Sequence, residues 1–384
     1  MSFGAIITHG ESNEQLPADM SKWLAEVRVE QEISKPDKVA IRFEDDICDD
    51  SFAVSTSDIL KDDNVLSVVV PYEDKERCLT RGRIVNVKTT NQISGAGSSV
   101  TVHCEQLIEM DRETIQANWQ GNEQNIVQSL LTAYGFKTDV KIPDPKVYDE
   151  DRQLNQRGTD LDFLEKLSAE SGVSLWIEYD LAQPVLKGGA YKFDETAHFK
   201  ISPTNKSDSL FSLANRILPS SDEPPSFRLS VGETECPNVN KFEAEIDFER
   251  PTKAEGTHID DASGETNEAK GKGDDNQVLK PGKVLPKISG VSRKIMPVTP
   301  GDGDKQTRQS DAALREASWY IDADVSTSVQ MLKYVLIPHD VIKVSGASAE
   351  LSVHYQVKSV VHVVNAADHM MDVKLRSNIG WESR

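Results

Sequence analysis

The sequence predicts an α+β fold that is mainly β, with two small antiparallel β units and a mixed α/β unit between them. Apolar and polar residues alternate with a period of two over about 22–109, and again from residue 227 onwards, between turns rich in glycine and serine. Over about 111–205 the apolar spacing changes to that of helices. Alternation of this kind is typical of antiparallel sheets or barrels with one buried face.

The first β unit is predicted from four short strands. One opens at Trp23–Val29, and Val65–Val70 is a continuous apolar run. Arg83–Lys88 follows, then a turn at Ser94–Ser98, then the alternating segment Val100–Cys104. The glycines of that turn suit a hairpin better than a phosphate cradle.

The mixed unit begins with a helix and returns to a strand. Residues 125–134 carry an apolar stripe at helical spacing, and Gly135 follows as a stop signal. Val173–Tyr179 is predicted to be a strand.

A second helix is predicted from its capping residues. Thr159 suits the N-cap, Asp162 lies three residues later as the acid of a capping box, and Gly172 stops the helix. The predicted buried face is Leu161, Leu164 and Leu167, with Phe163 beside it.

The rest of the chain is predicted to form the second β unit and an insertion. Phe227–Val231 and the alternating Phe242–Phe248 are strands, and residues 255–282 are a long exposed loop or disordered insertion because they offer almost no apolar side chains. A short amphipathic helix over 307–320 and alternating strands over 351–375 complete it. Two β units in one chain raise the possibility of an internal duplication.

These patterns divide the chain into five parts. We expect an N-terminal tail (1–19), a first β-barrel (20–110), an α/β domain (111–205), a second β-barrel (206–254 and 325–384) and an inserted loop-and-helix region (255–324).

Composition excludes several classes of function. The net charge of −20 argues against nucleic acid as a main partner. No apolar run approaches about 20 residues, and Met1–Met20 lacks the pattern of a signal peptide, so neither membrane insertion nor secretion through a signal peptide is expected. The charge fits solubility, or else a repulsive lumen or a surface that meets basic partners.

No motif predicts catalysis, a cofactor or a metal site. HExxH, GxSxG, Walker and GxGxxG patterns are missing, and the acidic clusters at 44–46 and 160–162 suit solvated turns and a helix cap. The three histidines in alternating strands are predicted to face solvent, and the four cysteines to be buried free thiols. These residues are His103, His354 and His362, and Cys48, Cys78, Cys104 and Cys236.

Two segments resemble a known family. Leu154–Leu167 with Gly172–Trp176 is similar to the "Q-x-x-x-T-D-hydrophobic-x-F" helix and following strand of phage late control gene D proteins and VgrG-type spike proteins. Leu336–Gly346 with Tyr355–His362 looks like the ending of the same proteins. The sequence departs from the pattern at 366–368, where an aromatic residue is usual, and in the length of the 255–282 insertion.

The resemblance implies a baseplate hub like that of T-even phages. In that family each subunit holds two related β-barrels, and three subunits present quasi-sixfold symmetry to a hexameric tube and threefold symmetry to a trimeric spike. The implied partners are therefore two further copies of the chain, a trimeric spike, a hexameric tube and other baseplate proteins, with no nucleic acid and no membrane insertion. The implied location is a phage tail or phage-like injection particle built from a chain made in the cytoplasm.

Two alternatives stay open: a hub-like part of a type VI secretion spike, and a soluble hydrolase. No lysozyme-like segment and no glycine-spaced valine repeat follow the last strands, so a stand-alone hub is expected rather than a fused VgrG. Loops at strand ends are the expected contacts with the tube. The interface candidates are Gly95, Gly97, Ser98, Pro338, His339 and Asp340.

Overall fold

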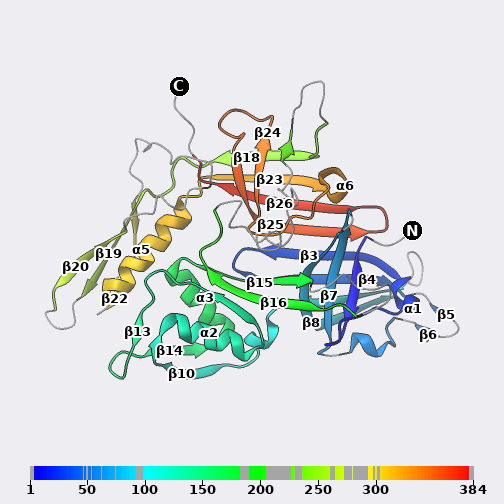
Figure 1. Ribbon diagram of the computed structural model, residues 1–384, viewed down its shortest axis with the longest axis horizontal. Helices are drawn as coiled ribbons and strands as arrows, with labels where there is room; N and C mark the ends of the chain where they lie inside the picture. Colours follow the sequence, from blue (N-terminus) through cyan, green and yellow to red (C-terminus); the bar gives the residue numbers. More distant parts are fainter. Residues whose placement is uncertain are drawn as a thin grey trace.

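The protein is mainly β, as predicted (Figure 1). The computed structural model describes residues 4–45, 47–48, 51–52, 54–61, 63–73, 75–91, 98–181, 190–204, 226–229, 236–259, 264–271, 279, 293–296, 299–300 and 303–379. None of the helices in these ranges combines the length and the apolar character that a membrane crossing requires.

The predicted strands of the first β unit are confirmed, and each is longer than expected. Its elements are β1 (Ile6–His9), β2 (Glu14–Gln15), α1 (Ala18–Ser21), β3 (Leu24–Glu32), β4 (Lys35–Glu44), β5 (Ile47–Cys48), β6 (Ser51–Phe52), η1 (Asp58–Leu60), β7 (Val65–Tyr72), β8 (Lys75–Asn91) and β9 (Ser98–Glu105). Their inward side chains form one core that includes Val29, Ile41, Phe43 and Val102, all fully buried.

The mixed unit confirms both predicted helices. Its elements are η2 (Ile108–Asp111), β10 (Ile115–Trp119), β11 (Gly121–Asn122), α2 (Glu123–Ala133), β12 (Lys137–Val140), β13 (Val147–Tyr148), β14 (Leu154–Gly158), α3 (Asp160–Ser171), β15 (Ser174–Leu181) and β16 (Phe193–Lys200). The capping box forms: the Asp162 N–H donates to Thr159 Oγ1 at 3.1 Å, and the Thr159 N–H donates to Asp162 Oδ2 at 3.3 Å. Gly172 ends α3 with φ +63°, in the left-handed region.

The remaining elements form the second β unit and a projecting arm. They are β17 (Phe227–Arg228), β18 (Lys241–Ile246), β19 (Lys253–Ile259), β20 (Thr266–Lys270), β21 (Arg293–Ile295), β22 (Thr299–Pro300), α5 (Gly303–Ala317), β23 (Ile321–Ser328), α6 (Val329–Leu332), β24 (Val341–Ser345), β25 (His354–Asn365) and β26 (His369–Ser377). We call β19–β22 with α5 the arm, which leaves the body on one side (Figure 1).

The arm corrects the prediction of a loop over 255–282. Residues 255–259 and 266–270 pair as an antiparallel hairpin, whose inner face packs on α5. That inner face is made of small residues: Ala254 and Ala269 are buried, and a Cβ at Gly256 would clash with Gln306 of α5. Because small residues give little apolar signal, the hairpin was not predicted.

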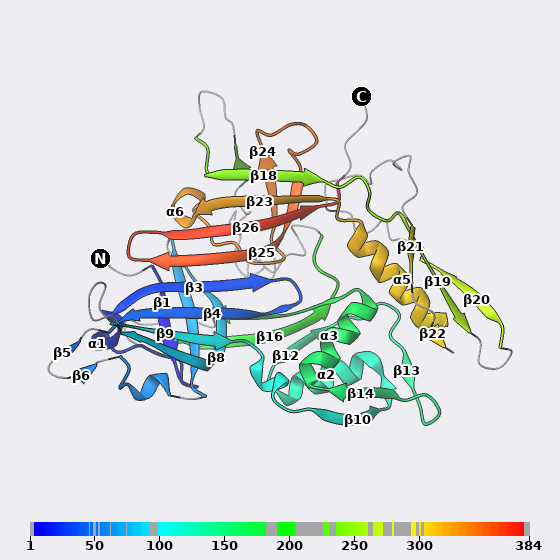
Figure 2. The ribbon, with the colours of Figure 1, turned by 180° about the vertical axis from the view of Figure 1, so that it is seen from behind.

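Strands of both β units form one continuous sheet. The strand order is β18-β23-β26-β25-β3-β4-β9-β8-β7-β1-β2, and off this path β24 pairs with β25 and β17 pairs with β24, thirteen strands in all (Figure 2). The two units join where β25 pairs with β3 in antiparallel register. Closure of either unit into a separate barrel is not found among the strands that the structure describes.

Candidate assembly surface

The continuous sheet contains the same strand arrangement twice. In the first β unit the spatial order is β3-β4-β9-β8, and β7 pairs with β8. In the second the order is β18-β23-β26-β25, and β24 pairs with β25. Each strand takes the same place in the chain order of its unit, so the topology is duplicated. We call these groups the first and second repeats.

The registers of the two repeats also agree. In the first, Ile84 of β8 lies opposite Cys104 of β9, and the register shifts between Ile84 and Asn86. In the second, Val357 of β25 lies opposite Leu375 of β26, and the register shifts directly afterwards. A β-bulge at the same point of both hairpins makes Ile84 and Val357 equivalent. The duplication predicted as a possibility is therefore present in the structure.

The repeats meet inside the chain and leave two strand edges open. At the meeting point β25 pairs with β3 from Ser359–Glu32 to Asn365–Glu26. Among the described residues, no strand pairs with the outer edge of β18, nor with β8 beyond Ile84 on the side away from β9. Val85 and Val87, on this open part of β8, are each 40 % exposed. Open edges of this length are ready to pair with another chain.

Negative charge gathers on the exposed face of β18. Glu243 lies opposite Asp324 and Glu245 opposite Asp322, both on β23. Like charges directly opposite in a sheet are destabilising. Within the described residues, Arg250 binds Asp322, while Glu245 has no ion-pair partner. This edge therefore suits a partner that brings a cation.

The predicted contact residues before β9 are only partly described. Gly95 and Gly97 lie outside the described residues. Ser98 is the half-buried first residue of β9, and its carbonyl oxygen accepts a hydrogen bond from the Asp45 N–H at 2.9 Å.

The segment Pro338–Asp340 corrects the prediction of a projecting loop, because all three residues are buried. The His339 N–H donates to the Val357 carbonyl at 2.9 Å, and the Asp340 carboxylate accepts from the Ile337 N–H at 3.1 Å. His339 has φ +74°, a conformation that non-glycine residues rarely adopt. The segment is a packed connection inside the molecule.

Aromatic stacking joins this connection to the mixed unit. The His339 ring lies 4.1 Å from the ring of Trp176 on β15, and Trp176 lies 4.8 Å from the ring of His198 on β16. The two ring nitrogens of His198 are 2.9 Å from Asp139 Oδ2 and 3.0 Å from Glu178 Oε2. Carboxylates thus fix the orientation of the imidazole against which Trp176 packs.

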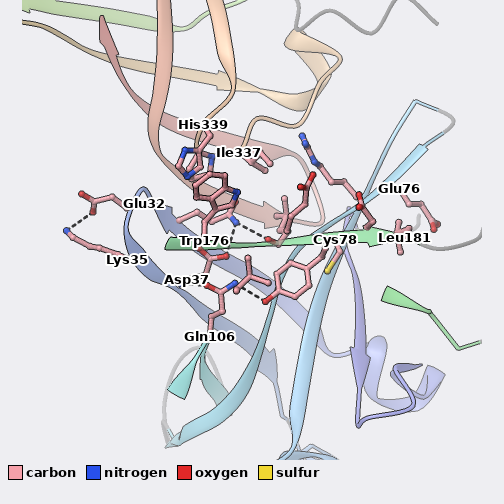
Figure 3. A pocket seen from close by; sticks show the side chains of 18 of the residues that line it. Glu32, Lys35, Asp37, Glu76, Cys78, Gln106, Trp176, Leu181, Ile337 and His339 are labelled. Carbon is pink, nitrogen blue, oxygen red and sulfur yellow. Dashed lines mark hydrogen bonds and ion pairs between the residues drawn. The ribbon is translucent and has the colours of Figure 1, made fainter. Parts of the chain in front are cut away.

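A cavity of about 260 Å³ lies beside this stack, where the three units meet (Figure 3). Its walls come from β3 and β4, from β8, from β15 and from residues 337–339. On its wall, Gln31 Nε2 donates to Asp37 Oδ2 at 2.9 Å, and Lys35 pairs with Glu32 at 2.8 Å. The carboxylates of Asp37 and Glu32 are thus engaged in an internal hydrogen bond and an ion pair.

Burial shifts the pKa values of the titratable side chains at and beside this cavity. It holds the pKa of His339 well below its ordinary value, and neighbouring cations add to that effect. Burial raises the pKa of Asp340 to about 6, against the opposing charge of Arg77. Burial likewise raises the pKa of Asp37 to about 7. No group of three or more His, Cys, Asp or Glu side chains in the described ranges is arranged to hold a metal ion.

Two other sequence expectations need correction. His362 is fully buried, with its Nδ1 3.0 Å from His369 Nε2, whereas it was expected to face solvent. The bulge after Val357 reverses which alternate residues face inward, and this reversal cannot be read from the alternation itself. Among the cysteines, Cys78 and Cys104 are buried free thiols as expected, but Cys236 is exposed.

Comparison with known structures identifies the fold. A tail protein from Neisseria meningitidis MC58 superimposes with a TM-score of 0.61 at 10 % sequence identity, covering 98 % of this chain and 97 % of that chain. The 43 kDa tail protein of prophage MuSo2 from Shewanella oneidensis gives 0.58 at 11 % identity, with 97 % of each chain covered. A chain of the half-lidded PdpA–VgrG complex of Francisella gives 0.55 at 11 % identity, covering 100 % of this chain and 60 % of that chain.

No family model matches the sequence, and no curated protein matches it. The likeness to solved structures therefore stands on geometry. It shows that the chain has the fold of phage tail proteins and VgrG-type spike proteins, over its whole length.

Proposed function

We propose that the protein is the baseplate hub of a contractile phage tail or phage-like injection particle, a homotrimeric adaptor between a hexameric tube and a trimeric spike. The observation that carries the proposal is the duplicated β arrangement within one chain. Three chains would supply six equivalent units, which match the symmetry of a hexameric tube. The other parts of the chain occur once per subunit, and they would keep the threefold symmetry of a spike.

The shape of the sheet supports an assembly role. Among the described residues, the row of eight strands from β18 to β8 has an open edge at β18 and, beyond Ile84, at β8, and such unpaired edges favour association. A head-to-tail contact between unlike edges generates a closed ring when the rotation closes. Activity would then reside in broad surfaces, and the protein would not be an enzyme.

Partners and location follow from the same proposal. The chain would bind two further copies, the spike, the tube and other baseplate proteins, within a tail or phage-like particle. Ser98 remains a candidate contact with the tube because it is the first residue of β9. Gly95 and Gly97 remain candidates on the sequence alone. The burial of Pro338, His339 and Asp340 argues against a direct tube contact there.

A second candidate is the hub part of a type VI secretion spike. The observation that favours it is the match of the whole chain to 60 % of a chain in a PdpA–VgrG complex. Both candidates are trimeric rings, so they differ in the machine that the ring enters. A soluble hydrolase is the third candidate; it needs two carboxyl groups facing across a cleft.

Light scattering of the purified chain, alone and mixed with its spike protein, tests the proposal. We expect three copies of the chain in the complex, and electron microscopy of the particle should place that complex between tube and spike. A stable complex with one or two copies would contradict the hub, and release of sugar from cell-wall material by the purified chain would favour the hydrolase.

A further inference from the structure

We infer that the open part of β8 pairs in antiparallel fashion with the open edge of β18 of a second copy of this chain, in a register that places Lys88 opposite Glu245. The inference rests on the proposed ring and adds its strand register. It starts from the junction that the chain already contains between its own repeats, where β25 of the second repeat pairs with β3 of the first.

The equivalence of the repeats predicts which strands meet between chains. β25 pairs with β24 before the bulge and with β3 after it. Its counterpart β8 pairs with β7 before the bulge and is open on that side beyond Ile84. The counterpart of β3 is β18, whose outer edge is open among the described residues. The contact that completes β8 is therefore β18 of a neighbour.

The register follows from residues already aligned. Val364 lies seven residues beyond Val357, and Asn91 lies seven residues beyond Ile84. Because Val357 and Ile84 are equivalent, Val364 and Asn91 are also equivalent. Opposed residues can be followed across the sheet from β8 through β9 and β4 to β3, and in the second repeat from β25 through β26 and β23 to β18. Followed in this way, Val27 of β3 is equivalent to Phe242 of β18. Since Val364 lies opposite Val27 within the chain, Asn91 lies opposite Phe242 between chains. The pairs are Val87–Ile246, Lys88–Glu245, Thr89–Ala244, Thr90–Glu243 and Asn91–Phe242.

The chemistry of the pairs fits this register. Val87 is 40 % exposed and Ile246 half-buried, so their pairing covers apolar surface on both strands. Lys88 is exposed and has no ion-pair partner among the described residues. In this register it meets Glu245, which lies opposite the like-charged Asp322 of β23. A shift by one residue would place Lys88 opposite Ala244 or Ile246 and turn Val87 to the wrong face.

The contact cannot form within one chain. β8 and β18 stand at opposite ends of a row of eight strands, as Figure 2 shows. At about 4.8 Å per step, the seven steps of the row span roughly 34 Å. A disulfide requires Cα atoms about 4.4–6.8 Å apart, which directly opposed residues of paired antiparallel strands provide. Cysteines at positions 88 and 245 therefore report contact between copies.

The experiment is disulfide cross-linking of the full chain with its spike protein, with Cys48 and Cys236 replaced by serine. Lys88→Cys with Glu245→Cys should give covalent dimers and trimers on mild oxidation. The matched control is Lys88→Cys with Lys241→Cys: position 241 is exposed on the same face of β18, but about 13 Å further along the strand. The control should stay uncross-linked.

Charge reversal gives a second, independent readout. Lys88→Glu should raise the protein concentration needed for half-assembly by about tenfold or more, because each of three contacts then opposes like charges. Adding Glu245→Lys should restore assembly. Circular dichroism of each variant checks that the chain is folded.

The outcomes separate the register from the hub. A trimer by light scattering in which 88 and 245 do not cross-link, or in which the control pair does, overturns the register and leaves the trimeric hub standing. A chain that stays monomeric with its spike overturns both. Failure of Glu245→Lys to rescue Lys88→Glu, in a folded protein that still forms trimers, also overturns the register.

Discussion

Single buried side chains tune the stability of this protein with pH, and Asp37 is the clearest case. It is 8 % exposed on β4, and burial raises the pKa of its carboxyl group to about 7. A raised folded-state pKa means that the native state holds the proton more tightly than the unfolded chain. Stability from this group is therefore present at low pH and is lost as pH rises from about 4 to about 7.

Asp37→Asn should stabilise the protein at pH 8 and change little at pH 4. The gain at pH 8 should be about 1–4 kcal/mol, because the amide never bears the buried charge. Its Nδ2 can donate to Gln31 Oε1, which has no partner in the folded chain. Chemical unfolding at the two pH values measures the difference. An equal change at both would mean that Asp37 ionises normally.

The start of α3 gives a second residue-scale prediction, in which a cap and a core residue are compared. Thr159→Ala should cost about 1 kcal/mol, because it removes the acceptor for the Asp162 N–H. Leu164→Ala should cost about 2–5 kcal/mol, because the side chain is fully buried. Thermal unfolding of the two variants tests the order. A larger loss from the cap variant would contradict the assignment of the buried face.

At the scale of elements, one buried ion pair anchors the arm to the mixed unit. Arg308 of α5 binds Glu123 of α2 through two contacts, of 2.6 and 3.0 Å, and also donates to Ser171 Oγ at 2.9 Å. Glu123 is fully buried, and it also accepts from the Lys146 N–H at 3.1 Å. The arm is thus attached through a charge that has no access to water.

Arg308→Met should destabilise the protein by about 3–5 kcal/mol, because it leaves the Glu123 carboxylate buried without a counter-charge. Adding Glu123→Gln should recover part of the loss, since the amide is neutral and still accepts from Lys146. Denaturant unfolding of the single and double variants measures both effects. A double variant less stable than Arg308→Met alone would show that the carboxylate is stabilised by other groups.

Sequence patterns predict elements whose signals are local or strongly apolar. The capping box of α3 and the apolar run of β7 could be read directly, since each depends on neighbouring residues. The β19–β20 hairpin could not, because its buried side chains are Ala254 and Ala269 and its other face is polar. Its pairing depends on α5, which lies far away in the sequence.

The candidate assembly surface was predictable only in outline. Alternation indicated two β units, and therefore a possible duplication. The bulge after Val357 placed His362 inside, although alternation predicted it outside. The order of the strands and the open edges of β8 and β18 depend on pairing between distant segments, which no local pattern specifies.

At the scale of the whole molecule, a ring adaptor needs units that hold fixed positions relative to one another. Three contacts provide this in the chain: the β25–β3 pairing, the Arg308–Glu123 ion pair and the stack of His339, Trp176 and His198. The strand pairing and the aromatic stack each join elements from different hydrophobic cores, and the ion pair attaches the arm to the mixed unit. The chain should therefore unfold largely as one body, although it contains several cores.

Trp176→Ala should weaken this coupling, because the indole ring joins β15 to the connection at His339 across a ring distance of 4.1 Å. We expect a loss of about 3 kcal/mol and the separation of one calorimetric transition into two, as the second β unit unfolds independently. The matched control is Trp119→Ala, since Trp119 stacks on Phe163 within the mixed unit. The control should lower the unfolding temperature without splitting the transition. Equal splitting in both variants would mean that a general loss of stability, and not the junction at Trp176, separates the units.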